Sequence, residues 1–283
     1  MSAREPASAS TPAGNPNAAS GRFTLDPDDL FRPRRRLRRL RRLVRRTAGV
    51  AAALALLASI VFCGLLLVTP SAGEAERLAM AQARAHHAVF PGPAVPRRFA
   101  ASLVATEDHR FYSEPGVDPI AIGRVIVGRV TGGPDQGGAT LYQQLAKLLY
   151  TPNGSGFVAK TEQMVLAVKL DFTYSKAQIL RMYADVAYFG HGFYGLAAAS
   201  CGYFGQRPAA LSWAQAAMLA GIVQAPSADD PLTHPAMARA REAHVLGRLV
   251  ATHTLTETQA SAALEEPVIH LTGNAGGGCA GSS

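Results

Sequence analysis

The sequence predicts a mainly α-helical domain that follows a single transmembrane helix. Two features support this: an uncharged apolar run of 21 residues near the N-terminus, and a series of amphipathic segments with helix-start signals between about Pro96 and Glu266. Runs of alternating β-branched residues, which would indicate strands, are scarce. A length of 283 residues with 48% hydrophobic content excludes a chain that is disordered throughout.

Surplus positive charge is confined to the N-terminal segment. Residues 1–46 contain 12 Arg and 4 acidic residues, whereas residues 47–283 contain 16 basic and 16 acidic residues. Because the larger part has no excess of cations to neutralise phosphates, no nucleic acid is expected as a partner. Residues 1–46 are expected to form a disordered, Arg-rich cytoplasmic tail.

The apolar run from Ala48 to Val68 is long enough to cross a bilayer as a helix. We expect this helix to occupy residues 47–69, because ten Arg between Arg32 and Arg46 would hold the N-terminus in the cytoplasm. The chain would then be a single-pass protein of the cell membrane with an extracytoplasmic domain. The alternative is a signal peptide cleaved near Ala72, but a run longer than the usual ~7–15 residues favours a retained anchor.

Beyond the anchor, we expect a linker with a membrane-proximal helix over residues 70–94, a helical domain over residues 95–266 and a flexible tail over residues 267–283. Cys201 follows small residues and is expected to be buried, and the three cysteines predict neither a disulfide framework nor a metal site.

Helices in the domain are indicated by apolar stripes and by capping boxes, in which Ser or Thr precedes Gln by three residues. Gly221 is positioned to end the helix that Ser212 begins. The stripes are Leu141, Leu145, Leu148 and Leu149, and then Val165, Val168 and Phe172; the boxes are Thr140–Gln143, Ser175–Gln178, Ser212–Gln215 and Thr256–Gln259.

Two segments carry chemistry that folding alone does not require. The first places the carboxylates of Glu107 and Asp108 next to an imidazole and a guanidinium at a helix end, although such an end can simply face water. In the second, Gly137-Gly138 opens a helix whose first turns carry Gln143, Gln144 and Lys147. Backbone N–H groups, amides and a cation are suitable donors to an anionic or sugar ligand.

Taken in order, five segments resemble those of the family 51 glycosyltransferases, the peptidoglycan polymerases of bacterial cell walls. The resemblance covers about residues 95–235. The segments are Glu107-Asp108 with Phe111-Tyr112 and Gly116-Val117-Asp118; Gly137-Gly138 through Gln144 to Lys147; Lys160 through Lys169-Leu170; Tyr174-Ser175-Lys176 with Ile179-Leu180; and Tyr188-Phe189-Gly190 through Gly205 to Leu219-Ala220-Gly221.

The resemblance implies a lysozyme-like glycosyltransferase fold with a membrane-associated lobe. It also implies the reaction: lipid II is polymerised into a growing glycan strand, with inversion at the anomeric carbon and release of polyprenyl diphosphate. By similarity Glu107 is the general base, and burial with the neighbouring Asp108 is expected to raise its pKa. Lipid II, the glycan strand and membrane lipids are the implied partners, and penicillin-binding transpeptidases are further candidates.

Substrate-binding positions follow from the same resemblance. The cations would stabilise the leaving diphosphate, and the amides would orient sugar and phosphate oxygens. No cofactor is obligatory, although a divalent cation is possible between Glu107, Asp108 and the diphosphate. The positions are Asp108, Arg124, Thr140, Gln143, Gln144, Lys147 and Lys160.

The sequence departs from the family pattern at several positions. Gln163 stands where a second glutamate is usual, and Ala159 stands where an arginine is usual. Glu162 is the nearest carboxylate, but one residue on a helix is about 100° of rotation. Asp185 replaces a usual asparagine. The paired loss at 159 and 163 keeps the net charge, so either a compensated variant or a weakened catalyst is consistent with it.

The sequence is therefore compatible with three functions. The first is a monofunctional peptidoglycan glycosyltransferase, because no Ser-x-x-Lys or Lys-Thr-Gly motif of a transpeptidase appears. The second is a catalytically weak scaffold that binds lipid II. The third is a lytic enzyme on the related fold, which is disfavoured because lytic cleavage needs no cations for a diphosphate. Retention of Glu107 favours the first.

Overall fold

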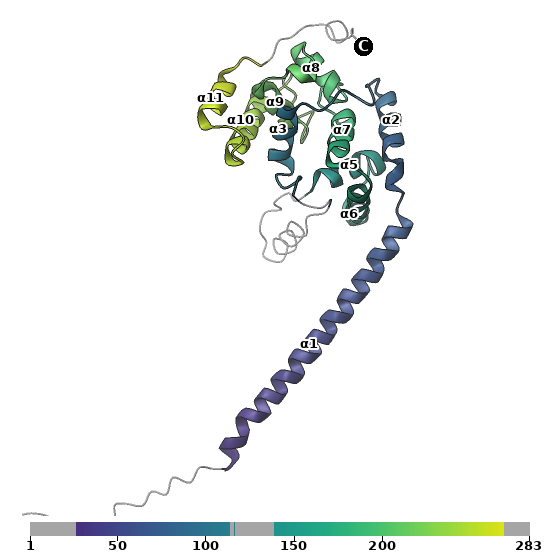
Figure 1. The fold of residues 1–283 in the computed structure, drawn as a ribbon, viewed down its shortest axis with the longest axis vertical. Helices are drawn as coiled ribbons and strands as arrows, with labels where there is room; N and C mark the ends of the chain where they lie inside the picture. Colours follow the sequence, from purple (N-terminus) through teal and green to yellow (C-terminus); the bar gives the residue numbers. More distant parts are fainter. Residues whose placement is uncertain (1–26, 114–115, 117–138, 269–283) are drawn as a thin grey trace, which may run out of the picture. The chain divides into compact units, whose positions relative to one another are not determined.

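The computed structural model describes residues 27–113, 116 and 139–268, with side chains from residue 40 onward. Within these residues every regular element is a helix, and the one β-type contact is an isolated antiparallel bridge between Tyr188 and Tyr194 (Figure 1). The prediction of a mainly α-helical chain is therefore confirmed.

The chain divides into two compact units, residues 1–60 and residues 61–283. Helix α1 (Pro27–Val68) is 42 residues long, and it is the one helix in the described part long and apolar enough to span a membrane. Its apolar side chains are exposed, including Leu54, Leu57 and Ile60 at about 60% each. No protein surface among the described residues covers them, which is consistent with a lipid environment.

Helix α1 begins 20 residues before the predicted span, so residues 27–46, which were expected to be disordered, are helical. The apolar helix extends backwards into this segment because Arg and Leu are good helix formers. Once a helix exists, each added residue lengthens it at little cost in free energy.

The second unit contains two groups of packed helices, with α8 in contact with both (Figure 1). The first group joins α3, α9, α10 and α11 around α9, which is almost wholly buried. The second joins α2, α5, α6 and α7. The elements are η1 (Ala72–Glu74), α2 (Ala75–Ala85), α3 (Arg97–Glu107), α5 (Leu141–Tyr150), α6 (Gly156–Thr173), α7 (Lys176–Val186), α8 (Leu196–Phe204), η2 (Pro208–Ala210), α9 (Trp213–Ile222), α10 (Pro235–Ala251) and α11 (Glu257–Glu265).

All four predicted capping boxes are present, and they begin α5, α7, α9 and α11. In each, the Ser or Thr side chain accepts a hydrogen bond from the backbone N–H of the Gln. Local hydrogen bonding therefore sets where these helices start.

Three details differ from the sequence prediction. Gly221 lies inside α9, which continues to Ile222, so it does not end the helix. The lack of a side chain instead permits the close approach of α10, since a Cβ there would crowd Arg241. Phe172, placed in an apolar stripe, is 87% exposed. Cys201 is only half-buried and is disulfide-bonded, with its partner outside the described residues. The expectation that Cys201 is simply a small buried residue was therefore wrong, since residue spacing does not report which cysteines meet in space.

Asp185 fixes the loop between α2 and α3 onto α7. Its carboxylate is buried and accepts a 2.8 Å hydrogen bond from the N–H of Gly92, while Arg181 donates to the carbonyl of Gly92 at 2.6 Å. A Cβ at residue 92 would collide with this carboxylate, so the close approach requires glycine. Burial raises the pKa of Asp185 to about 6, and the Gly92 hydrogen bond and Arg181 oppose the rise.

Asp185→Asn is expected to change how stability depends on pH. The folded-state pKa of Asp185 lies above the ordinary value of 3.8, so the folded protein loses stability as pH rises from about 4 to about 6. Asparagine removes that ionisation and retains an acceptor for Gly92. The variant should gain about 1–3 kcal/mol relative to wild type between pH 4 and pH 7, measured by denaturant unfolding. If the variant and the wild type differed in unfolding free energy by the same amount at pH 4 and at pH 7, a raised pKa of Asp185 would be contradicted.

Candidate functional site

The two helix groups meet at Glu107, the last residue of α3. Gln144 of α5 donates a hydrogen bond from Nε2 to Oε2 of Glu107 at 2.8 Å. Tyr183 of α7 donates from its hydroxyl to Oε1 of Gln144 at 2.9 Å. Three helices that are distant in sequence thus contribute one connected set of side chains, which we call the Glu107 chain: Glu107, Gln144 and Tyr183.

Burial raises the pKa of Glu107 above its ordinary value. The Gln144 hydrogen bond and the positive charges of Arg241 and His244 on α10 oppose this rise without cancelling it. The expected rise is therefore present, and burial causes it rather than the neighbouring Asp108. A carboxyl group in this state exchanges its proton closer to neutral pH than an exposed glutamate does.

Asp108, Thr140 and Gln143 shape the N-terminus of α5. Oδ2 of Asp108 accepts from the N–H of Leu141 at 3.0 Å, and Oγ1 of Thr140 accepts from the N–H of Gln143 at 3.3 Å. Thr140 also donates to the carbonyl of Gly116 at 2.7 Å. The protein itself therefore uses two of the backbone donors that the sequence suggested for an anionic ligand.

Two predicted cations are exposed. Lys147 lies on α5, three residues after Gln144, so the two share a helix face. Lys160 lies in the first turns of α6. Within the described residues, neither lysine makes a hydrogen bond or an ion pair. Arg124 and Gly137-Gly138 lie outside the part of the chain that the structure describes.

The departures at 159 and 163 occupy the inner side of α6. Nε2 of Gln163 donates to Oγ1 of Thr151 at 2.9 Å, which ties α6 to the residue that ends α5. Ala159 is buried and lies close to Gly154. Glu162 is half-buried. No contact in the described part connects these residues to Glu107.

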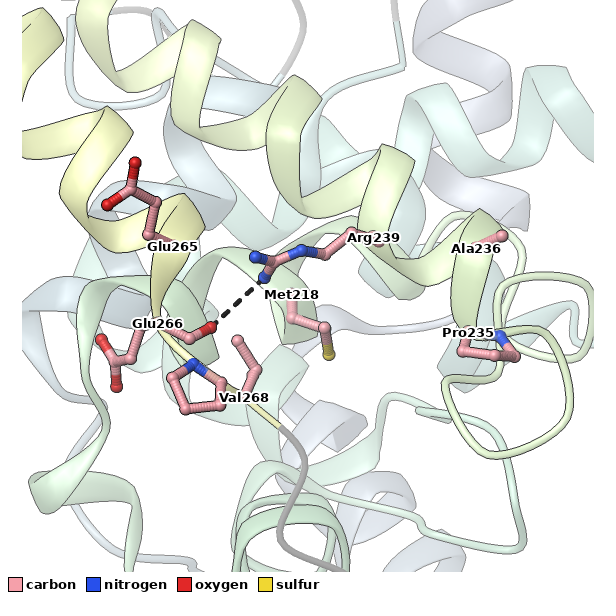
Figure 2. Close-up of a pocket in the computed structure, with 8 residues that line it drawn as sticks. Met218, Pro235, Ala236, Arg239, Glu265, Glu266 and Val268 are labelled. Carbon is pink, nitrogen blue, oxygen red and sulfur yellow. Dashed lines mark hydrogen bonds between the residues drawn. The ribbon is translucent and has the colours of Figure 1, made fainter.

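A cavity of about 460 Å³ lies elsewhere, among α9, α10 and the segment after α11 (Figure 2). Met218, Pro235 and Val268 make its wall largely apolar. Its cation, Arg239, is held by both carboxylate oxygens of Glu242 at 2.9 and 2.8 Å. No member of the Glu107 chain lines this cavity, so it is not part of the candidate site.

Sequence reasoning missed Tyr183, Arg241 and His244. Tyr183 falls between two of the matching segments, and the α10 residues lie beyond all of them. Their relation to Glu107 depends on how α7 and α10 pack, which no local pattern reports. Among the described residues, no three His, Cys, Asp or Glu side chains gather into a group that could hold a metal ion.

Comparison with known proteins places the site in context. A family model described as transglycosylase matches residues 74–250. Penicillin-binding protein 1F of Bacillus subtilis is 37% identical over 156 residues, and penicillin-binding protein 1A of Haemophilus influenzae is 36% identical over 176 residues. These matches cover 55% and 62% of this chain but only 22% and 21% of the relatives.

A relative of more similar length is a Cupriavidus necator protein that bears the name putative transglycosylase. It is 34% identical over 174 residues, which cover 62% of this chain and 75% of that protein. A solved structure of penicillin-binding protein 1A from Haemophilus influenzae aligns with a TM-score of 0.39 at 21% identity, covering 64% of this chain and 18% of that one.

Glu107→Gln is expected to stabilise the protein at alkaline pH. The raised pKa means that ionising Glu107 costs the folded state free energy once the pH exceeds the ordinary value of 4.5. Glutamine keeps an acceptor for Gln144 without the buried charge. We expect a gain of about 0.5–2 kcal/mol at pH 8 that disappears near pH 4, measured by denaturant unfolding. A loss of stability at pH 8 would contradict the assignment.

Proposed function

Because the chain belongs to the transglycosylase family, we propose that it is a peptidoglycan glycosyltransferase that polymerises lipid II into glycan strands. The observation that carries the proposal is the buried carboxyl group of Glu107, which has a raised pKa and lies at the junction of the two helix groups. The relatives named as penicillin-binding proteins support the same class of reaction.

In the proposed reaction, ionised Glu107 takes the proton of the acceptor's 4-hydroxyl group. The acceptor oxygen attacks the anomeric carbon of the donor as the bond from that carbon to the diphosphate oxygen breaks. The configuration inverts, and polyprenyl diphosphate leaves with the bonding electron pair. Burial and nearby positive charge have opposite effects on the pKa of the proposed base: burial raises it and so makes Glu107 a stronger proton acceptor, whereas the charges on α10 lower it and favour the ionised form.

Negative charge grows on the diphosphate as it leaves, and cations facing it would lower the barrier. Lys147 supports this role because it is exposed and shares a face of α5 with Gln144. Lys160 and Arg124 are proposed for the same role from the family resemblance. A divalent cation, where one takes part, would arrive with the diphosphate oxygens.

The proposed location is the cell membrane, with residues 70–283 outside the cytoplasm. The arginines that precede the apolar part of α1 support this orientation. A site outside the cytoplasm would also permit work beside penicillin-binding transpeptidases.

Helix α6 supports direct contact with lipid. Phe157 and Phe172 are 82% and 87% exposed, and their separation of 15 residues puts them within about 60° of each other around the helix. Lys169 on the same helix donates to the carbonyls of Thr69 and Pro70 at 2.8 and 3.0 Å, where α1 has just ended. The apolar face of α6 is thus tied to the segment that follows the anchor.

The proposed base is tested by Glu107→Gln in the full-length protein with labelled lipid II. Glutamine keeps the shape of the side chain but does not accept the proton, so glycan formation should fall by about 10²–10⁴-fold while lipid II binding persists. Products are separated by gel electrophoresis. A variant that keeps more than about a tenth of wild-type turnover would exclude Glu107 as the base. Binding without polymer in the wild type would favour the scaffold function.

The lipid contact is tested with residues 69–283, which retain the carbonyls that Lys169 binds. Replacing Phe157 and Phe172 together by serine should weaken binding to lipid vesicles by about tenfold or more, because two apolar side chains no longer enter the interface. Met237→Ser on α10, which is 53% exposed, is the matched control. Equal losses in both variants would contradict a specific role for α6.

A further inference from the structure

We propose that Tyr183 is a positioning residue for Glu107, acting through the amide of Gln144. Its hydroxyl group holds the amide in the orientation that turns Nε2 toward the carboxylate. The inference rests on the proposed function, because it assigns Tyr183 a role in the proton transfer to Glu107. It extends the site to a residue of α7.

The hydrogen-bonding capacities of the three groups determine the orientation. An ionised carboxylate only accepts, so the Gln144 atom that faces Glu107 at 2.8 Å must be the donor Nε2. Oε1 then faces Tyr183 at 2.9 Å, and the phenol must donate to it. Burial and the charge of Glu107 raise the pKa of Tyr183, so the phenol keeps the proton that this bond requires.

The same chain of groups accommodates the protonated state of Glu107. A protonated carboxyl group donates, and it is satisfied when the amide rotates by half a turn and presents Oε1 to Glu107. Nε2 then faces Tyr183, whose hydroxyl oxygen also accepts hydrogen bonds. The protonated state thus requires the amide to turn, whereas the ionised state is satisfied by the observed arrangement, in which the hydroxyl group of Tyr183 donates to Oε1 of Gln144. Tyr183 in this orientation therefore favours the ionised form of Glu107.

The surroundings leave Tyr183 few other roles. Its side chain is 3% exposed, and Gln144 is its hydrogen-bond partner among the described residues. Of the other groups that act on Glu107, Arg241 is paired with Asp229 at 2.8 Å and His244 is exposed. Both lie on α10, on the other helix group, so a change at Tyr183 leaves their contacts in place.

The test compares Tyr183→Phe with Tyr203→Phe in the full-length protein. Tyr203 is also fully buried, and its hydroxyl donates to the carbonyl of Phe189 at 2.9 Å, away from the Glu107 chain. Each variant loses a buried hydroxyl group that donates a hydrogen bond, and the Tyr203 hydroxyl also interacts with Asp230, so Tyr203→Phe should be destabilised at least as much as Tyr183→Phe. A purely structural role for Tyr183 predicts that the two behave alike.

The expected difference lies in the pH profile of polymerisation. In Tyr183→Phe the amide is no longer held, and the protonated form of Glu107 gains relative to the ionised form. Turnover should fall about three- to tenfold on the acidic side and return to within about twofold of wild type at alkaline pH, with KM unchanged. Tyr203→Phe should stay within about twofold throughout. A uniform loss across pH, or the same profile in both variants, would overturn the proposal.

A double-mutant cycle tests whether Tyr183 acts through the amide. Gln144→Met removes both hydrogen bonds, so adding Tyr183→Phe to it should change the acidic limb by less than about twofold. A second, multiplicative loss would show that Tyr183 acts by another route.

A measurement independent of activity separates this inference from the proposed function. Carbon-13 NMR of labelled glutamate reports the titration of Glu107, assigned with Glu107→Gln. The titration should move to higher pH in Tyr183→Phe and stay in place in Tyr203→Phe. If it moves while the wild type makes no polymer, the positioning role stands and the proposed function fails; if it does not move, the positioning role fails.

Discussion

The site depends on placing a carboxyl group at the buried end of a helix. Glu107 ends α3, where the helix dipole disfavours negative charge, and burial adds to the cost. The last turn of α3 has no basic residue of its own. Other helices offset this unfavourable free energy. Gln144 donates a hydrogen bond to the carboxylate, and Arg241 and His244 lower its pKa through their charge. Arg248 also donates to the carbonyl of Ala105, in the last turn of α3, at 3.1 Å.

The same contacts join the two helix groups. Glu107 and Asp108 extend from the end of α3, and they bind Gln144 and the backbone of Leu141 at the start of α5. Any shift of α5 against α3 would therefore move the proposed base and also change its hydrogen bond to Gln144. Precise placement of a catalytic group commonly costs stability, and for the proposed base the cost is the burial of Glu107.

The sequence predicted what local chemistry decides. Capping boxes marked the starts of four helices, and the buried positions Leu141, Leu145 and Leu149 followed the helical period. The family resemblance identified Glu107, whose position at the end of a helix was expected. These features depend on residues only a few positions apart, so a single sequence is enough to recognise them.

What the sequence could not predict depends on packing between distant segments. Gln144 was expected to orient substrate, but its amide faces Glu107 and Tyr183. Gly221 carried a helix-ending signal, yet it serves the close approach of α9 to α10. Asp185 departs from a usual asparagine, and only the fold shows that it binds the N–H of Gly92, far away in sequence.

The central claim is that Glu107, with a pKa raised by burial, is the base whose ionisation controls the reaction. The most direct measurement compares two values for the wild-type protein: the pKa of Glu107 from carbon-13 NMR, and the pKa that governs the acidic limb of kcat/KM for lipid II polymerisation. We predict that they coincide and lie above 4.5. A Glu107 pKa at or below 4.5, or an acidic limb that follows a different ionisation, would contradict the claim.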